Sequence, residues 1–378
     1  MRAFDVVIAG AGPAGCVAAR DLARSGARVA LIDGSHPREK ACGGGVTSRA
    51  LRLIGGNAGV TAAQPIDAIT FEAAGCRVQV CLPDTGVLGV YSRAAFDADL
   101  LRQATDAGVV HVPARVGAIA RHGAAWDVST GSAILSAPWL LGADGPAGVV
   151  RKQVFRPFAR RQLSIAAGSF VDGVSVRDIV IGFTDEPSGY LWSFPRPGHL
   201  AVGSCAQATE TTTAEMHRVT DQWLDRYAPA ANRPRLRYAW PIPSLEARDV
   251  DAERPAGDGW MLLGDAAGLV DPITREGIFF ALRSGILAAE ALQRTSPARH
   301  YEDSVRDELH GELRRAARLK AGFFRPRFTR LMIDALARSA AIQDVMVDLV
   351  AGRQTYAGLR RRLLGTLEFD LMVRVLFG

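Results

Sequence analysis

The stretch FDVVIAGAGPAGCVAARDLARSGARVALID, residues Phe4–Asp33, decides the fold of this chain. Its first part, Phe4–Ala9, is an apolar run long enough for one buried strand, and a glycine-rich turn over 10–15 follows at once. A helix is predicted from about Ala14 to Ser25, and Arg28–Ile32 predicts a second buried strand. The order strand, glycine turn, helix, strand is typical of an α/β unit with a parallel sheet.

The glycines of this turn have separate physical roles. Gly10 permits the tight turn, Gly12 lets the backbone approach a pyrophosphate, and Gly15 allows close helix–strand packing. The helix N-terminus offers free N–H groups to phosphates, and Asp33 can accept hydrogen bonds from a ribose. A tight turn in another α/β protein is the alternative, and the pattern does not distinguish FAD from NAD. The residues predicted to contact the nucleotide are Gly10, Gly12, Pro13, Ala14, Gly15 and Asp33.

The composition is that of an ordinary globular protein, with 48% apolar and 22% charged residues in 378. No apolar run is long enough to span a bilayer, and no signal peptide is evident. The five cysteines are odd in number and lack paired metal-ligand spacing, so no metal site is predicted. A reducing cytoplasm is the simplest expectation.

The positive charge is concentrated in the C-terminal part of the chain. Residues 312–378 contain twelve arginines and one lysine against six acidic residues, a surplus of +7 in a chain whose net charge is +6. A basic tail favours an anionic membrane surface or an acidic protein partner. Solvated helix faces explain the charge equally well. No nucleic-acid partner is predicted.

Two further strands end in small residues and an acid. Ile134–Leu141 is predicted to be one strand, and it leads into Gly142-Ala143-Asp144-Gly145. Trp260–Leu263 predicts another strand, which leads into Gly264-Asp265 and then into a helix over 278–292. The N-terminus of that helix would stabilise negative charge developing on a ligand.

The segment after Asp33 contains Cys42 and three consecutive glycines, 43–45. Because such a run destabilises regular structure, it suits backbone that passes close to a flat ligand, although a flexible surface loop is the alternative. Ser92 is a predicted N-cap, and Arg93 beside it could reach a phosphate or lie on the surface with a carboxylate neighbour.

The middle of the chain predicts a second, β-rich region. Within it Tyr190, Trp192 and Phe194 alternate and would share one face of a strand, either lining an apolar cavity or filling a core. A helix is predicted over Thr213–Tyr227, and proline-rich segments follow over 229–243. Beyond Ser296 three helical segments are predicted, 297–320, 326–350 and 356–377.

Together these motifs resemble the FAD-dependent flavoproteins built like para-hydroxybenzoate hydroxylase, over Phe4 to about Leu292. Within that class the chain is most similar to the geranylgeranyl reductase family. The shared segments are Cys-Gly-Gly-Gly at 42–45, Tyr-x-Trp-x-Phe-Pro at 190–195, and Gly-Asp-Ala-Ala-Gly with a following Asp-Pro and Glu-Gly-Ile. Arg275 stands where that family usually has glycine.

The resemblance implies an FAD cofactor held by one domain, with NAD(P)H as a transient electron donor. It implies reduction of isolated carbon–carbon double bonds in a polyprenyl chain or a similar apolar, lipid-like substrate. The implied catalytic residues are Cys42, Tyr190 and Trp192. The implied cofactor contacts beyond the first turn are Cys42, Gly43, Gly44, Arg93, Asp144, Gly264, Asp265, Pro272, Gly277 and Ile278.

Two alternatives remain open at this stage. One is an FAD-dependent monooxygenase acting on an aromatic or indole substrate, free or on a peptide or carrier protein. A halogenase is disfavoured, because the three lysines, 40, 152 and 320, lie outside the segment that would match a catalytic lysine. The other is an FAD-binding assembly factor whose basic tail docks a protein partner.

The predicted architecture has three parts. An α/β, Rossmann-like FAD-binding domain is discontinuous, an α+β substrate domain carries an antiparallel sheet, and a helical region ends the chain. Their predicted boundaries are 1–62, 88–155 and 250–295 for the FAD-binding domain, 63–87 and 156–249 for the substrate domain, and 296–378 for the helical region.

Overall fold

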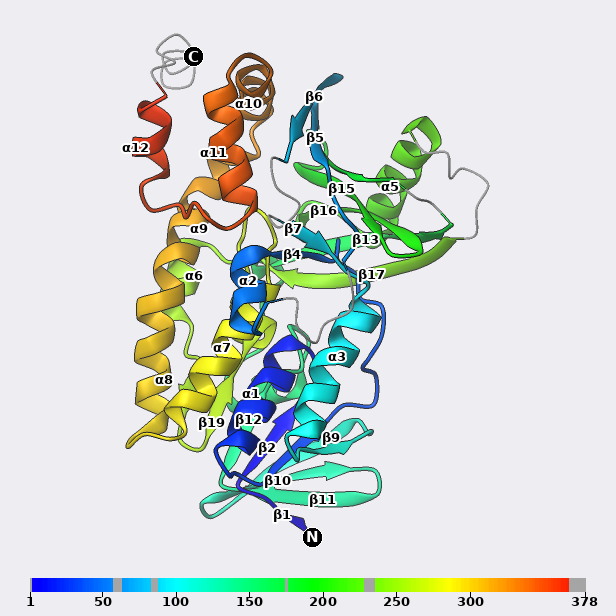
Figure 1. Cartoon of the computed structure of the whole chain (residues 1–378). Coiled ribbons are helices and arrows are strands. Elements are labelled where there is room, and N and C mark those ends of the chain that lie inside the picture. Colours follow the sequence, from blue (N-terminus) through cyan, green and yellow to red (C-terminus); the bar gives the residue numbers. More distant parts are fainter. Residues whose placement is uncertain (1, 57–62, 83–87, 174–175, 228–234, 367–378) are drawn as a thin grey trace.

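The computed structural model describes residues 2–56, 63–82, 88–173, 176–227 and 235–366. Figure 1 shows two lobes stacked one above the other, with the N-terminus at the bottom. Helices α8 and α9, Pro297–Val305 and Gly311–Phe323, run along one side from the lower lobe toward the upper one. Within the described residues, no helix combines the length and the apolar character needed to cross a membrane.

A six-stranded sheet forms the centre of the lower lobe, in the order β18-β19-β12-β2-β3-β8. All neighbours are parallel except β18 and β19. All four residues of β2 and of β3 are buried, as expected for strands covered on both faces. The strands are β18 Ala256–Gly257, β19 Trp260–Leu262, β12 Trp139–Gly142, β2 Val6–Ala9, β3 Val29–Ile32 and β8 Val110–Val112.

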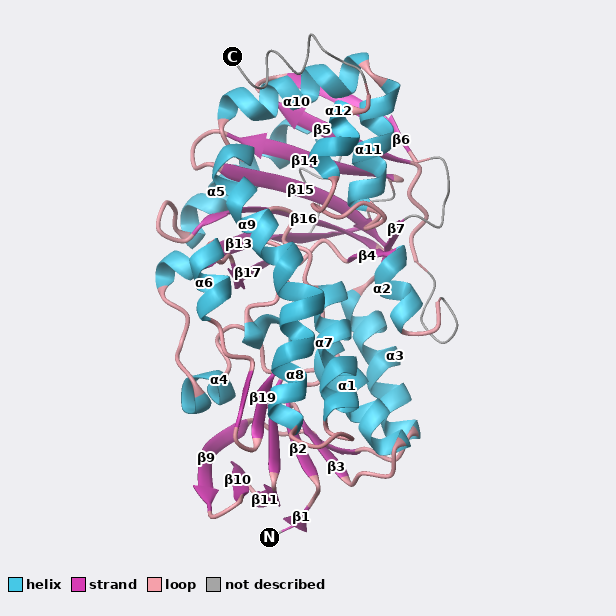
Figure 2. Ribbon diagram, turned by 90° about the vertical axis from the view of Figure 1, so that its left-hand side faces the viewer, coloured by secondary structure: helices cyan, strands magenta, loops and turns pink. Residues whose placement is uncertain are grey.

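Helices α1 (Pro13–Arg24), α3 (Arg93–Asp106) and α7 (Ile278–Ala291) lie side by side over this sheet (Figure 2). A β-carbon added at Gly285 would lie 2.5 Å from the carbonyl oxygen of Ala14, so α1 and α7 pack at backbone contact. This close packing holds the first turns of α1 against the middle of α7.

A second, four-stranded sheet has the order β1-β11-β10-β9 and packs into the same core. The prediction of one strand over Ile134–Leu141 is wrong. The chain forms β11 (Ala133–Ala137) in the four-stranded sheet and then β12 in the six-stranded sheet. Pro138 lies between the two strands; it has no N–H to donate to either ladder. The remaining strands of this sheet are β1 Arg2–Ala3, β9 Val116–His122 and β10 Ala125–Thr130.

The upper lobe contains a seven-stranded sheet in the order β17-β13-β16-β15-β14-β5-β6. Helix α5 (Thr213–Tyr227) covers one face, with Met216 and Leu224 in the buried clusters there. All neighbours are antiparallel except β14 and β5. The strands are β5 Ala68–Ala73, β6 Cys76–Cys81, β13 Leu163–Asp172, β14 Asp178–Thr184, β15 Gly189–Arg196, β16 His199–Gln207 and β17 Arg235–Pro243.

Strand β17 occupies the second part of the proline-rich segment 229–243, of which 229–234 lie outside the described residues. The strand is at the edge of the sheet and pairs only with β13. Pro241 and Pro243 are tolerated there because an edge strand has one side without ladder hydrogen bonds.

The C-terminal helices connect the two lobes. Tyr301 of α8 donates a hydrogen bond to the carbonyl oxygen of Leu262, 2.8 Å away, and α10 packs against β5 and β6. The predicted segment 356–377 is described only to residue 366, within which α12 spans Leu359–Leu364. The other elements are a π-helical turn η3 Arg306–His310, α10 Pro326–Arg338 and α11 Ala340–Val350.

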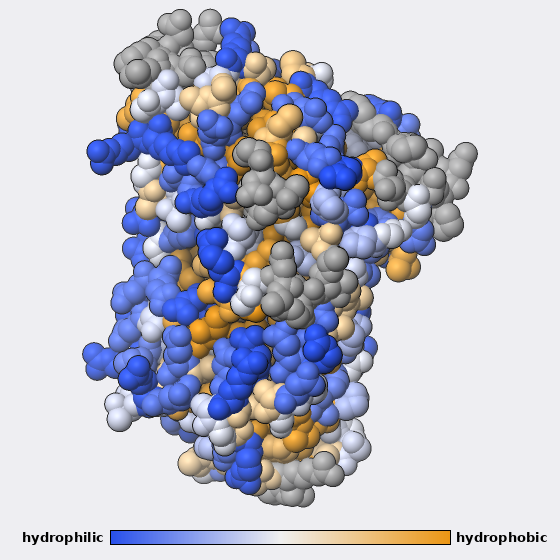
Figure 3. Space-filling model, in the orientation of Figure 1, coloured by the Kyte–Doolittle hydropathy of each residue, from blue (hydrophilic) through white to orange (hydrophobic). Residues whose placement is uncertain are grey.

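Short elements join the lobes. Strands β4 (Gly45–Thr47) and β7 (Leu88–Val90) pair with each other between them, and α2 follows β4. In Figure 3 most of the visible face is hydrophilic, and hydrophobic residues show mainly in its middle and toward its top. The remaining short helices are α2 Ser48–Leu53, α4 Val149–Val154, η1 Arg160–Gln162, α6 Ala247–Ala252 and η2 Gly264–Ala267.

Candidate active site

The turns that follow β2, β12 and β19 in the lower lobe meet at the start of α1. Gly10 has φ +102°, and a β-carbon there would lie 2.3 Å from the carbonyl oxygen of Ala143 in the second turn. At Gly264, in the third turn, an added β-carbon would lie 3.4 Å from the β-carbon of Ala14. The second and third turns therefore pack directly on the first.

The N-terminus of α1 is open for an anion. Gly12 is the N-cap, no side chain caps the helix, and Pro13 is its first residue. A β-carbon at Gly12 would meet only the His36 ring, 3.9 Å away, so there is space in front of the first turn. Free N–H groups beside open space are what a pyrophosphate needs.

Asp33 directly follows β3, and neighbouring residues of the nucleotide-binding corner hold its carboxylate. Its Oδ2 accepts a hydrogen bond from the Ala11 N–H at 2.9 Å and lies 2.7 Å from His36 Nδ1. Burial alone would raise the pKa of Asp33, but the contacts with His36, Ala11 and Ser35 outweigh it and hold the pKa well below its usual value. The residue is therefore an anion where a ribose is expected.

Asp144 presents a buried acceptor with no partner. Its Oδ2 accepts a hydrogen bond from the Val150 N–H at 3.0 Å, whereas Oδ1 is buried and has no hydrogen-bond partner among the described residues. Burial raises the pKa of Asp144, partly offset by the Val150 contact. An unpartnered buried oxygen is costly unless a ligand donates to it.

Asp265 lies beside the start of α7. Its Oδ2 is 3.9 Å from Lys40 Nζ, and a β-carbon at Gly277 would lie 3.3 Å from its Oδ1. Gly277 is the N-cap of α7 without a side-chain cap, so the N–H groups from Ile278 onward are free of side-chain partners. Pro272, earlier in the same loop, is buried. Together these residues fit the sugar and ring portions of a flavin nucleotide.

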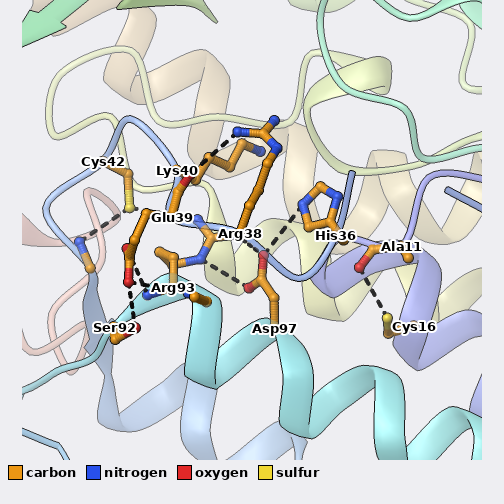
Figure 4. A network of polar contacts seen from close by, with 12 residues as sticks. Ala11, Cys16, His36, Arg38, Glu39, Lys40, Cys42, Ser92, Arg93 and Asp97 are labelled. Carbon is orange, nitrogen blue, oxygen red and sulfur yellow. Dashed lines mark hydrogen bonds and ion pairs between the residues drawn. The ribbon is translucent and has the colours of Figure 1, made fainter. Parts of the chain in front are cut away.

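Three hydrogen-bond donors lie near the sulfur of Cys42, of which Figure 4 labels Arg93. The Gly44 N–H lies 3.1 Å from Sγ, Arg93 Nη1 lies 3.6 Å away and Arg196 Nη2 lies 3.9 Å away. Burial alone would raise the pKa of this thiol, but Arg93 and Arg196 outweigh it and lower the pKa. Cys42 is therefore placed for ionisation.

Packing within the protein accounts for the consecutive glycines. A β-carbon at Gly43 would lie 2.8 Å from the Phe194 ring, and at Gly44 (φ +86°) one would lie 2.3 Å from the carbonyl oxygen of Tyr91. The flat group that requires glycine on this side of the loop is thus the aromatic ring of Phe194. Contact of Gly43 and Gly44 with a cofactor stays a prediction.

Arg93 is buried, and most of its donors are occupied. Its Nε and Nη2 bind the carboxylate of Asp97 at 3.0 and 2.8 Å, and Nη1 is directed at Cys42. A role in reaching FAD stays a prediction, because the donors of Arg93 are directed at Asp97 and at Cys42.

The aromatic residues of β15 join both loops. The Tyr190 hydroxyl donates to the carbonyl oxygen of Thr274 at 3.3 Å, and its ring stacks on Phe324 of the C-terminal region at 6.3 Å. Trp192 lies 5.8 Å from Tyr190, and Phe194 packs on Gly43. These three aromatic residues, called the β15 stripe below, therefore extend from the loop around Cys42 to the loop before α7.

Sequence reasoning missed Arg196, Glu39 and Lys320. Arg196 follows the aromatic motif directly, and this adjacency was an available signal. Lys320 reaches the upper sheet from α9, with Nζ 2.6 Å from both Gln207 Oε1 and Ser244 Oγ. Burial lowers the pKa of Lys320 to about 8, and the charge of Arg275 contributes.

Arg275 has φ +59°, in the left-handed region. This conformation explains why glycine suits the position, since only glycine adopts it without strain. Its Nη1 donates to the carbonyl oxygen of Pro272 in the same loop. The departure from glycine therefore leaves the path of the loop intact.

The fold and the converging turns define a class, the FAD-dependent oxidoreductases. Residues 3–294 match the family model described as an FAD binding domain, and the chain belongs to this family. Residues at all three turns fit FAD.

Within this class, the resemblance to the geranylgeranyl reductase family is confirmed by curated relatives. The chain is 28% identical to the menaquinone reductase of Mycobacterium tuberculosis, over 93% of this chain and 91% of the relative. It is 30% identical to a digeranylgeranylglycerophospholipid reductase of Methanoculleus marisnigri, over 77% of each. A geranylgeranyl bacteriochlorophyll reductase-like protein of Thermoplasma acidophilum has the same fold, with a TM-score of 0.77, 20% identity and coverage of 97% of this chain and 100% of that one.

Proposed function

We propose that this enzyme reduces carbon–carbon double bonds of a polyprenyl or similarly apolar substrate. Bound, reduced FAD would supply the hydride. The observation that carries the proposal is the position of the β15 stripe, with Phe194 packed on Gly43 and the Tyr190 hydroxyl on Thr274. The β15 stripe would thereby form an apolar wall between the loop around Cys42 and the loop before α7, the two loops proposed to contact the flavin.

The residues of this wall would act by positioning. An isolated alkene is unactivated, so it must be held close to the hydride donor with water excluded. Tyr190 and Trp192 would orient the chain, and Phe324 would close the wall from the C-terminal side. We propose that Cys42 assists the reduction from a position near the flavin, beside the reacting carbons.

The names of the relatives support this substrate class. Menaquinone and digeranylgeranylglycerophospholipid differ in their head groups and share a polyprenyl chain. A binding wall that recognises the chain suits either kind of substrate. We infer NAD(P)H as the transient electron donor, because the glycine-rich nucleotide motif at 10–15 would hold FAD and the sequence shows no second motif of this kind.

The test uses the purified holoprotein under anaerobic conditions. The flavin is reduced by light or by NADPH and then mixed with menaquinone or with a geranylgeranyl lipid. The expected result is flavin reoxidation together with a mass gain of two hydrogens per reduced double bond. The Trp192→Ala variant should bind FAD normally and lose this turnover.

A second mixing experiment decides between the reductase and its rivals. Reduced enzyme is exposed to air without substrate. Slow reoxidation is expected for a reductase, whereas fast reoxidation through a transient near-ultraviolet absorbing species would indicate a monooxygenase. Failure of every lipid, combined with one stoichiometric protein partner from the native host, would favour the assembly factor.

We also propose that the basic C-terminal helices contact an anionic membrane surface. Arg325, Arg327 and Arg361 are exposed there, and a lipid substrate would be collected at such a surface. Binding to anionic vesicles should weaken with salt and with Arg325→Gln/Arg327→Gln. Removal of two exposed arginines elsewhere, Arg24→Gln/Arg52→Gln, should leave it unchanged. Equal binding to neutral vesicles would contradict the proposal.

A further inference from the structure

Arg196 is a buried arginine, and its own strand, β15, contains no acidic residue that could neutralise its charge. It is the last residue of β15, and its side chain is 0% exposed. Together with Arg151 it is one of the two largest fully buried side chains among the described residues. Burial of a guanidinium is costly unless all its donors are used.

The donors of Arg196 are directed at one loop. They bind the backbone carbonyl oxygens of Lys40 at 3.3 Å, of Gly43 at 3.1 Å, and of Cys42. The same guanidinium forms an ion pair with the carboxylate of Glu39. These three carbonyl contacts and the ion pair, spread over residues 39–43, fix the path of the backbone on both sides of Cys42.

Glu39 connects this loop to α3. Its carboxylate accepts hydrogen bonds from the Ser92 hydroxyl, from the Arg93 N–H at 3.2 Å and from the Ala94 N–H at 3.4 Å (Figure 4). It therefore caps the helix on which Arg93 lies. Arg196, Glu39 and Arg93 form one connected unit around the cysteine.

The groups around the sulfur favour negative charge on it. Three donors point at Sγ, and a thiolate accepts such hydrogen bonds far better than a thiol does. Asp97 neutralises part of Arg93, and Glu39 part of Arg196. The other titratable groups close enough to interact with the sulfur or with Arg196 are Tyr190 of β15, His199 of β16 and Tyr238 of β17.

We propose that Arg196 is the positioning residue for Cys42: it fixes the loop so that the sulfur lies between two guanidinium groups as a thiolate at neutral pH. The inference goes beyond the proposed function, because it concerns the state of the thiol and holds for a reductase or a monooxygenase alike. A thiolate carries no proton, so the proton added to an alkene would come from another group.

The test is the pH profile of alkylation by iodoacetamide on the FAD-loaded protein, with each cysteine followed by peptide mass spectrometry. Cys76 and Cys81 are exposed and serve as internal references. Cys42 should reach its half-maximal rate at a lower pH than either. Arg196→Gln should move the Cys42 midpoint upward by a unit or more, which lowers the rate at neutral pH about tenfold.

Matched variants separate positioning from a general loss of stability. Arg151→Gln removes the other large buried arginine, which pairs with Glu253, and should leave the Cys42 midpoint unchanged. Arg196→Lys keeps a charge without the planar fork and should restore the midpoint only in part. FAD content and circular dichroism establish that each variant is folded.

A second readout covers the case in which the reagent fails to reach Cys42. The thiolate absorbs in the far ultraviolet, and its titration is obtained as the difference between wild type and Cys42→Ser. The proposal is overturned if Cys42 titrates with the exposed cysteines, or if folded Arg196→Gln titrates as wild type does.

Discussion

The backbone N–H of Ala11 lies 2.9 Å from Oδ2 of Asp33, so the acid that ends the second strand is bonded to the glycine turn that ends the first. This contact joins the two parts of the nucleotide corner across 22 residues. The Asp33→Asn variant should bind FAD about tenfold to hundredfold more weakly, because a charged acceptor is replaced by a neutral one. Flavin content and fluorescence titration measure the affinity. Asp21→Asn, on α1 and paired with Arg20, should leave it unchanged.

Gly44 should tolerate a side chain far less well than another glycine of similar conformation. Gly44→Ala places a methyl group 2.3 Å from the Tyr91 carbonyl oxygen at φ +86°, and should lower the free energy of unfolding by about 3 kcal/mol or more. Gly108 has φ +98° with nothing within 4 Å of an added β-carbon, so Gly108→Ala should cost only about 1 kcal/mol. Urea unfolding compares them, and equal losses would contradict the steric argument.

Arg275 allows a direct measurement of backbone strain. Arg275→Ala keeps a β-carbon at φ +59° and loses the bond to Pro272, whereas Arg275→Gly loses the bond but relieves the conformation. The glycine variant should be more stable than the alanine variant by about 1 kcal/mol. Thermal unfolding of the two holoproteins gives the difference. A more stable alanine variant would show that the loop is not strained.

The lowered pKa of Lys320 predicts that the free energy of unfolding rises with pH. Its pKa in the folded protein is about 8, below the ordinary 10.5, so between these values the unfolded chain binds more protons than the folded one. Relative to Lys320→Met, wild type should therefore gain about 2–3 kcal/mol as the pH rises through this window. Urea unfolding of both proteins across the window measures the gain. The exposed Lys152, changed to Met, should show no such difference.

Arg49 holds the loop before α7 to the C-terminal region. Its guanidinium pairs with Glu276 and, at 3.2 Å, with Glu312 of α9. Arg49→Met leaves two partly buried carboxylates unpaired and should destabilise the protein by about 3–5 kcal/mol. Adding Glu276→Gln should recover part of this loss, because one unpaired charge is removed. If the double variant is less stable than the single one, the ion pair is not the cause.

Much of the fold could be predicted because it depends on local patterns. The Phe4–Asp33 corner, the Ser92 cap of α3 and the bounds of α5 all follow from residues near one another in the chain. The error over Ile134–Leu141 arose where the context is not local. Pro138 separates two strands that belong to different sheets, which the apolar pattern of this segment does not reveal.

For the candidate site, the sequence predicted a set of residues, which stays a prediction, and it did not reveal their long-range partners. The Arg196 guanidinium contacts carbonyl groups more than 150 positions away, and Arg49 reaches Glu276 across 227. No periodicity within a segment encodes such contacts. The three glycines 43–45 were expected to make room for a ligand. In the structure the Phe194 ring lies against Gly43 and Gly45, and the Tyr91 carbonyl oxygen lies against Gly44.

The sequence by itself determined the nucleotide-binding corner Phe4–Asp33, since that unit depends on glycines and one acid at fixed positions within a single segment, and its resemblance to a flavoprotein family indicated FAD. Only the tertiary structure decided the electrostatic surroundings of Cys42. It buries Arg93 and Arg196 against Cys42 from two different lobes, and the pKa of a thiol depends on charges close in space, whatever their distance along the chain.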